Sequence, residues 1–146
     1  MLDSVDPTDP IVATRIVEIQ RAAYRVEAEL IGFDGIPQLA ESVEQVQALG
    51  SMKWLGAFDN GRLAGIIAWI ETHSMVDIDR LAVDPNAARR GHGRQLVQSV
   101  PDDRLTVVST GAENRPARSL YETEGFERTG ETEIAPGVFL VHFERS

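Results

Sequence analysis

Two glycines near the middle of the chain, Gly91 and Gly93, are spaced so that the backbone around them could hold a phosphate group. Glycine permits a tight turn with uncovered N–H groups, and a helix that follows adds the partial positive charge of its amino end. Three arginines would donate charge-assisted hydrogen bonds to the same anion: Arg89, Arg90 and Arg94. A loop that merely turns tightly has the same pattern. Dinucleotide-binding loops and P-loops are excluded, because Leu96 replaces the third glycine and no Gly-Lys-Ser/Thr sequence is present.

Three carboxylates precede this loop and are candidates for a general base. Asp77 and Asp79 are two residues apart on an expected strand, and Glu71 ends the preceding strand. Two like charges so close tend to raise the pKa of one of them, which suits a base. A pair of aspartates on a solvated strand face has the same pattern, and any of the three could instead bind a cationic substrate. We rank the two aspartates equally and Glu71 below them.

The remaining side chains limit the chemistry further. The chain has no cysteine, which excludes disulfides, thiolate nucleophiles and thiolate zinc sites. The histidines at 73, 92 and 142 lack the spacing of a metal site, and no Gly-x-Ser-x-Gly sequence accompanies them for a hydrolase. We therefore expect no metal, and we interpret the histidine side chains as structural or surface groups.

The elements that must position these residues begin with two helices. Asp9 before Pro10 is typical of a helix start, and apolar residues then recur at spacings of three and four, as on one buried face. These residues are Val12, Ile16, Ile19, Ala23, Val26 and Leu30. The same spacing predicts a second, shorter helix that ends at Gly50. Its apolar residues are Leu39, Val43, Val46 and Leu49.

Short apolar runs then indicate strands. The runs 54–58 and 63–70 are separated by Asp59-Asn60-Gly61, and Asn-Gly between two such runs predicts a hairpin. A third run covers residues 75–83. Alternation divides it into two faces, one with Asp77, Asp79, Leu81 and Val83 and the other with Val76, Ile78, Arg80 and Ala82.

Helices and strands alternate in the second half of the chain. The glycine-rich loop leads into a helix that Pro101 stops, and residues 105–108 are typical of a buried strand. Asn114 can cap a further helix, and residues 138–143 form a last strand. This order predicts an α/β (α+β) fold in a single domain of residues 1–146, with a mixed sheet and helices on both faces.

Composition and charge limit the partners. The chain is 42% apolar and 25% charged, which is ordinary for a folded domain. No apolar run approaches the ~20 residues of a membrane helix, and the amino terminus is acidic where a signal peptide would be basic. The net charge of −9 opposes binding to nucleic acid. We expect a cytoplasmic protein with no nucleic-acid or membrane partner, either a monomer or a homodimer.

Two segments resemble motifs of the GNAT superfamily of acetyl-CoA-dependent N-acetyltransferases. Residues 78–85, Ile-Asp-Arg-Leu-Ala-Val-Asp-Pro, and residues 90–96, Arg-Gly-His-Gly-Arg-Gln-Leu, resemble its acetyl-CoA motif. Residues 114–126 are similar to its second motif, N-x-x-A-x-x-L-Y-x-x-x-G-F. The motifs occur in the family's order, about twenty residues apart, and the order of helices and strands extends the resemblance to nearly the whole chain.

The resemblance implies the fold and the cofactor contacts of that family. The sheet would have six to seven strands, with the fourth and fifth splayed apart and the pantetheine arm of acetyl-CoA between them. The residues that match cofactor-binding positions are Leu81, Ala82, Val83, Arg89, Arg90, Gly91, His92, Gly93, Arg94, Asn114 and Arg118. The sequence departs from the family at Ala88, where Gln or Arg is usual.

The resemblance also implies an activity. Tyr121 matches the tyrosine that commonly protonates the departing thiolate, and Asp77 matches a strand position where some members carry a catalytic glutamate. The implied function is direct transfer of an acetyl group from acetyl-CoA to a primary amine of a small molecule or of a protein lysine or N-terminus. The acidic residues favour a cationic acceptor. A non-catalytic acyl-CoA-binding regulatory module of the same fold is the alternative, and Ala88 is its only support.

Overall fold

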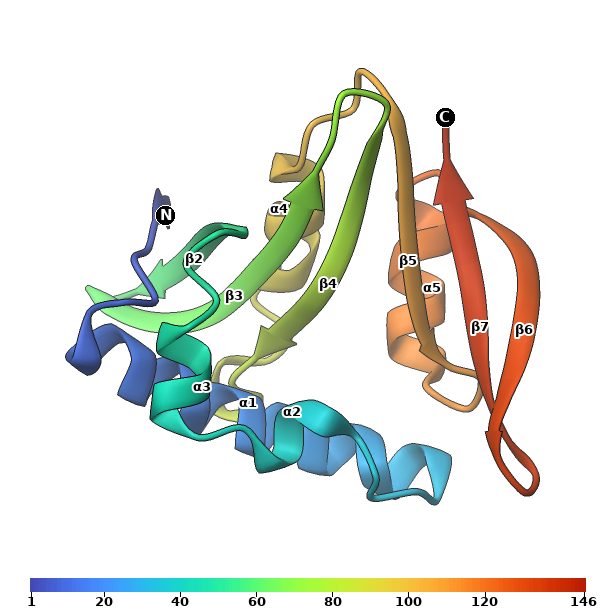
Figure 1. Cartoon of the computed structure of the whole chain (residues 1–146), viewed down its shortest axis with the longest axis horizontal. Coiled ribbons are helices and arrows are strands. Elements are labelled where there is room, and N and C mark those ends of the chain that lie inside the picture. Colours follow the sequence, from blue (N-terminus) through green and yellow to red (C-terminus); the bar gives the residue numbers. More distant parts are fainter.

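A seven-stranded sheet with the strand order β1-β2-β3-β4-β5-β7-β6 organises the chain in the computed structural model, which describes residues 1–146 (Figure 1). The strands are β1 (Leu2–Ser4), β2 (Lys53–Asp59), β3 (Arg62–Glu71), β4 (Met75–Val83), β5 (Leu105–Gly111), β6 (Glu127–Ala135) and β7 (Val138–Arg145). The helices are α1 (Pro10–Ile31), α2 (Pro37–Ala40), α3 (Val43–Gln47), α4 (His92–Ser99) and α5 (Arg115–Thr123), and a 3₁₀ turn, η1 (Pro85–Ala87), precedes α4.

Strands β4 and β5 form the one parallel pair and separate after a short contact. Only Met75–Asp77 of β4 pair with Leu105–Val107 of β5, whereas every other neighbouring pair of strands is antiparallel. Beyond this contact the two strands diverge, which leaves an opening in the middle of the sheet (Figure 1). The predicted mixed sheet with splayed fourth and fifth strands is therefore confirmed.

Helices cover both faces of the sheet, as predicted. One core joins α1 and α3 to the sheet, and its buried members include Ile16, Ile19, Val46, Trp54, Ile66 and Ala82. The other core lies under α4 and α5, and its buried members include Ile67, Val76, Leu96, Val97, Tyr121 and Phe143. None of the helices is both long and apolar enough to cross a membrane.

Helix α1 begins and ends with caps that its sequence encodes. The Asp9 carboxylate accepts hydrogen bonds from the N–H groups of Ile11 and Val12, and Gly32 ends the helix in the left-handed conformation. The predicted buried face is wrong at Val26 and Leu30, which are 45% and 44% exposed. The reason is that the buried stripe of α1 continues through Gln20, Tyr24 and Ile31, which lie on a different face from Val26 and Leu30.

The predicted second helix is two short helices. The Ser42 hydroxyl accepts from the Gln45 N–H, and the Gln45 side chain accepts from the Ser42 N–H, so a capping box starts α3. This local hydrogen bonding stops α2 at Ala40 and redirects the chain, although the apolar spacing continues across the break.

The hairpin between β2 and β3 is confirmed. Asp59 pairs with Arg62, so the loop contains only Asn60 and Gly61. Both residues have positive φ angles, 53° and 77°, as a type I′ turn requires.

A β-bulge in β4 changes the faces that alternation predicts. Ala68 of β3 pairs with Arg80, and the next residue, Trp69, pairs with Ile78, so Asp79 has no partner across the strands. Ile78 therefore belongs to the core under α4 and α5, whereas Ala82 belongs to the core under α1. The prediction that Val76, Ile78, Arg80 and Ala82 share one face is wrong, because one extra residue reverses the alternation.

Two strands have no counterpart among the predicted elements. Both are edge strands, β1 at one side of the sheet and β6 at the other. Strand β1 has three residues, and no residue of β6 is buried. Neither therefore carries the apolar alternation from which a strand is recognised.

Candidate active site

A cavity of about 600 Å³ lies where β4 and β5 diverge. Helix α1 reaches both strands across this opening: the Tyr24 hydroxyl donates to the Leu81 carbonyl of β4 at 3.3 Å, and Glu27 contacts β5. The segment 31–38 after α1 forms an apolar wall, and Ile134 and Leu140 of the last two strands form another. Strand divergence thus creates a cavity with walls from six elements of the chain and the segment after α1.

Asp77 and Asp79 both line the cavity, but their environments differ. Asp77 is half-buried and no group donates a hydrogen bond to its carboxylate; burial and, secondarily, the charge of Asp79 raise its pKa. Asp79 lies in the bulge, and its carboxylate accepts a hydrogen bond from Arg80 Nε at 2.7 Å. The charge of Asp79 is therefore countered, whereas that of Asp77 is not.

Arg80 joins three parts of the protein beneath this site. Its side chain is 4% exposed, and its Nη1 donates to Gln20 Oε1 of α1 at 2.9 Å and to Glu41 Oε1 at 2.5 Å. The guanidinium also lies over the ring of Trp54, 5.6 Å from its centroid. Burial alone would lower the pKa of Arg80, but its bonds to Glu41 and Asp79 raise it, so the side chain stays charged.

Substitution of Arg80 with methionine is expected to cost about 3 kcal/mol in free energy of unfolding, because Glu41 and Gln20 would lose a buried partner. Chemical denaturation measures this value. Arg25→Met is the control, since Arg25 is exposed on the same helix that Arg80 contacts, and it should change stability by less than about 0.5 kcal/mol. Equal stability of the two variants would show that the network contributes nothing.

Tyr121 enters the cavity from α5. The residue is 4% exposed, and its ring packs edge-on against Phe126 with centroids 5.6 Å apart. Its hydroxyl makes no hydrogen bond within the chain, and the residue lines the cavity. Burial raises the pKa of Tyr121, and the charge of Glu27 raises it further by a smaller amount. Its phenol therefore keeps its proton throughout the physiological pH range.

Glu27 is a further acidic residue of the cavity that sequence reasoning missed. Its Oε1 accepts from the Thr110 hydroxyl at 3.1 Å and from the Gly111 N–H at 3.5 Å, and no cation pairs with it. Helical spacing could have identified it. Glu27 follows Gln20 by seven residues, so both polar residues lie on the same helix face as the buried Ile16 and Tyr24.

Glu71 is not part of this group. It is exposed at the end of β3, and its Oε1 accepts from Trp69 Nε1 at 3.2 Å. The cavity lining does not include it, so the structure brings Asp77 and Asp79 together with Tyr121 but leaves Glu71 outside.

The loop before α4 presents backbone donors without side-chain partners. Gly91, at φ 81°, is the N-cap residue of α4 and has no side chain to accept from the first-turn N–H groups. A Cβ on Gly93 would lie 3.5 Å from Leu120 and 3.8 Å from Val83, which is ordinary contact. Neither backbone strain nor packing therefore requires glycine at position 93, whereas a ligand approaching the backbone would.

The arginines of this loop differ in their partners. Arg90 forms an ion pair with Asp59, and Arg94 Nε lies 3.6 Å from Glu124 Oε2. Arg89 has a φ of 63°, is exposed and has no acidic partner. His92 is 8% exposed with neither ring nitrogen hydrogen-bonded, and Asp59 lies 3.5 Å from its Nε2.

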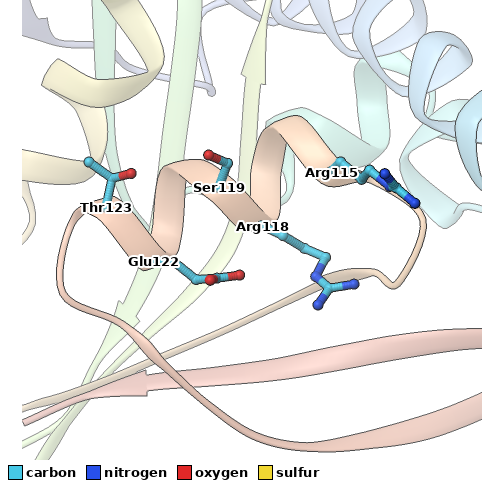
Figure 2. Close-up of a pocket in the computed structure, with 5 residues that line it drawn as sticks. All are labelled: Arg115, Arg118, Ser119, Glu122 and Thr123. Carbon is cyan, nitrogen blue, oxygen red and sulfur yellow. The ribbon is translucent and has the colours of Figure 1, made fainter.

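The other predicted cofactor residues lie in different surroundings. Ala82 is buried in the core under α1, and Val83 packs against the core under α4 and α5. Leu81 and Asn114 line the cavity, and the Asn114 side chain also caps α5 by accepting from Ala117 N–H at 3.3 Å. Arg118 lies elsewhere: its Nη1 donates to the Ala112 carbonyl at 2.8 Å. A separate hollow of about 440 Å³ on α5 is lined by Arg115, Arg118, Ser119, Glu122 and Thr123 (Figure 2).

Comparison with known proteins assigns this chain to a family. The family model described as "Acetyltransferase (GNAT) domain" matches residues 25–146. The UPF0157 protein YqkA of Bacillus subtilis (strain 168) is 36% identical over 98% of this chain, which spans only 43% of that protein's length.

Two solved structures share the fold at low sequence identity. One is the ribosomal-protein-S18-alanine N-acetyltransferase from Escherichia coli (TM-score 0.78, 18% identity, 99% of this chain and 92% of that one). The other is the PaiA N-acetyltransferase from Thermoplasma acidophilum in complex with coenzyme A (TM-score 0.75, 16% identity, 97% and 96%). With the family match over most of its length, the chain belongs to the GNAT acetyltransferases.

Proposed function

We propose that this protein transfers an acetyl group from acetyl-CoA to a primary amine by direct attack. The observation that carries the proposal is the cavity between β4 and β5, which brings Asp77 and Tyr121 to one space. Acetylation of an amine needs one group that takes a proton from nitrogen and another that gives a proton to the departing sulfur. A half-buried carboxylate and a protonated phenol supply these two functions.

The residues fit acetyl-CoA, which supplies the acetyl group as a reactive thioester. The uncapped amide groups at the start of α4 would bind the pyrophosphate, and Arg89 is the loop arginine without an acidic partner. Backbone groups of Leu81 and Val83, which lie beyond the part of β4 that pairs with β5, would bind the pantetheine arm. Arg90 and Arg94 already bind carboxylates, so their contribution to the pyrophosphate would be smaller.

The acceptor is a cationic amine, either of a small molecule or of a protein lysine or N-terminus. Asp77 and Glu27 are carboxylates of the cavity without a cationic partner, and they would attract an ammonium group. Asp77 takes a proton from the amine, because Asp79 is held by Arg80 and Glu71 lies outside the cavity. Tyr121 donates its proton to the departing sulfur.

Binding of acetyl-CoA tests the cofactor part of this proposal. Calorimetric titration should give a Kd that rises at least about tenfold in Gly93→Glu, because the new carboxylate would repel the pyrophosphate. An acidic residue in the first turn of a helix is compatible with folding. Gly130→Glu is the matched control, since a Cβ there meets no atom within 4 Å and the charge change is the same. Equal affinity of both variants would contradict this position for the pyrophosphate.

Thiol release separates an enzyme from a binding module. The wild-type protein with acetyl-CoA and a panel of amines (putrescine, 2-phenylethylamine, N-acetyl-lysine amide and a tetrapeptide with a free amino terminus) should release coenzyme A faster with at least one of them. Tight binding of acetyl-CoA without amine-dependent release would contradict catalysis and favour the regulatory alternative.

A further inference from the structure

Three side chains on the adjacent strands β5, β7 and β6 form a hydrogen-bonded series that leads from the cavity outward. Ser109 of β5 lines the cavity, and its Oγ lies 2.6 Å from His142 Nδ1 of β7. The other ring nitrogen, Nε2, lies 2.7 Å from Thr132 Oγ1 of β6. Ser109 and His142 are direct cross-strand partners, so the sheet itself fixes the first of these contacts.

His142 lies on the side of the sheet that α4 and α5 leave uncovered. Its neighbours in β7, Val141 and Phe143, are buried in the core under those helices, and successive residues of a strand point to opposite faces. The imidazole is half-buried, so it reaches both the cavity residue Ser109 and solvent.

The two contacts define what the imidazole can do. When Ser109 donates its hydroxyl proton, Nδ1 is the free acceptor and Nε2 carries the ring proton, which it donates to Thr132. Thr132 thereby holds the tautomer in which Nδ1 can accept a further proton. An imidazole in this arrangement can take a proton from Ser109 on Nδ1 and release one to solvent.

No other titratable side chain competes for this position. Strand β5 contains no charged residue. On β6, Arg128 and Glu131 form an ion pair, and Glu133 accepts from the Gly137 N–H. On β7, Glu144 pairs across the strands with Val107 and Glu127, and Arg145 donates to the Glu124 carbonyl. His142 is the one titratable group that contacts Ser109.

The proposed reaction requires a proton to leave the site. A primary ammonium that becomes an amide loses two protons from nitrogen, and the departing sulfur gains one through Tyr121, so one proton per turnover must reach solvent. We infer that Ser109 and His142 carry this proton: the nitrogen gives a proton to Ser109 Oγ while the Ser109 hydroxyl proton passes to His142 Nδ1. The imidazolium then releases a proton to water. Asp77 takes the other proton and passes it to Tyr121 in the same cavity, which restores the phenol that gave its proton to sulfur. This inference rests on the proposed function.

Steady-state kinetics with acetyl-CoA and the best amine of the panel test the relay. His142→Ala and Ser109→Ala should each lower kcat about tenfold to hundredfold. His142→Ala should do so with little change in the KM for the amine, because the imidazole contacts Ser109 and Thr132 and not the substrate. Added imidazole should restore much of the kcat of His142→Ala. His73→Ala is the matched control, since His73 is exposed in the β3–β4 turn, and it should keep the wild-type kcat.

A second readout needs no turnover. Long-range ¹H–¹⁵N NMR spectra of the free protein should give His142 as the tautomer protonated on Nε2, and Ser109→Ala should shift its Nδ1 resonance. A ring protonated on Nδ1 would overturn the relay, because Ser109 could then only accept a hydrogen bond. If the wild type is active and both His142→Ala and Ser109→Ala keep the kcat of His73→Ala, the relay is overturned and the proposed function stands. A wild type that releases no thiol with any amine would overturn the proposed function and the relay with it.

Discussion

Replacement of Asp77 with asparagine is expected to lower kcat/KM about 100- to 1,000-fold, which is the usual effect of losing a general base. The carboxylate is half-buried in the cavity and accepts no hydrogen bond from the protein, so asparagine preserves the volume and removes the charge and the basicity. Steady-state measurement of thiol release gives this value. Glu71→Gln is the matched control, because it removes a charge outside the cavity and should have no such effect. An Asp77→Asn enzyme within threefold of wild type would contradict the assignment.

The pH dependence of the same reaction follows from the raised pKa of Asp77. Burial and the nearby charge of Asp79 raise the pKa of Asp77, and only the ionised carboxylate accepts a proton. In the His142→Ala background, where the relay does not contribute, activity should therefore fall as the pH drops through this raised pKa, at a higher pH than an ordinary aspartate of pKa about 3.9 would give. Asp79→Asn removes the smaller cause, so it should move the acid limb to lower pH without restoring the ordinary value. An acid limb that stays in place would show that another group controls it.

The fold followed from local sequence features wherever a strand or helix carries its own apolar pattern. The bounds of β4, the Asn60-Gly61 hairpin and the Asp9 cap at the start of α1 were predicted in this way, because each depends on residues close together in the sequence. The bulge at Asp79 does not. It depends on how β4 pairs with β3, and the sequence of β4 by itself shows only regular alternation. For that reason the two faces of this strand could not be assigned in advance.

The site could be predicted only in part, because some of its contacts join residues far apart in the sequence. Tyr121 and Asp77 could be named because they match family motifs, whereas Glu27 meets its partner Thr110 across 83 positions of the chain and Ser109 meets His142 across 33. Contacts of this kind arise from the order of strands in the sheet, not from spacing. The sequence also left Asp77 and Asp79 equivalent, whereas in the structure Arg80 donates a hydrogen bond to Asp79, and Asp77 is half-buried without such a partner.

Tyr121→Phe is the second substitution with a large expected effect. It removes one hydroxyl that makes no hydrogen bond within the chain, so the ring should keep its packing against Phe126 and Phe143. Stability should then change by less than about 0.5 kcal/mol. In contrast, Tyr24→Phe removes a hydroxyl bonded to the Leu81 carbonyl and should cost about 1 kcal/mol. Thermal unfolding of the two variants checks this difference.

The effect of Tyr121→Phe on catalysis should be far larger than its effect on stability. The substitution removes the phenol that we propose as the proton donor to the departing sulfur, so kcat should fall about 100-fold or more while the Kd of acetyl-CoA stays close to wild type. Calorimetry and steady-state kinetics on the same preparation separate the two quantities. Because the raised pKa keeps Tyr121 protonated, the wild type should not lose activity through this group as the pH rises toward 10. A variant with nearly wild-type kcat would mean that water protonates the sulfur, and Tyr121 would then be a core residue that merely shapes the cavity.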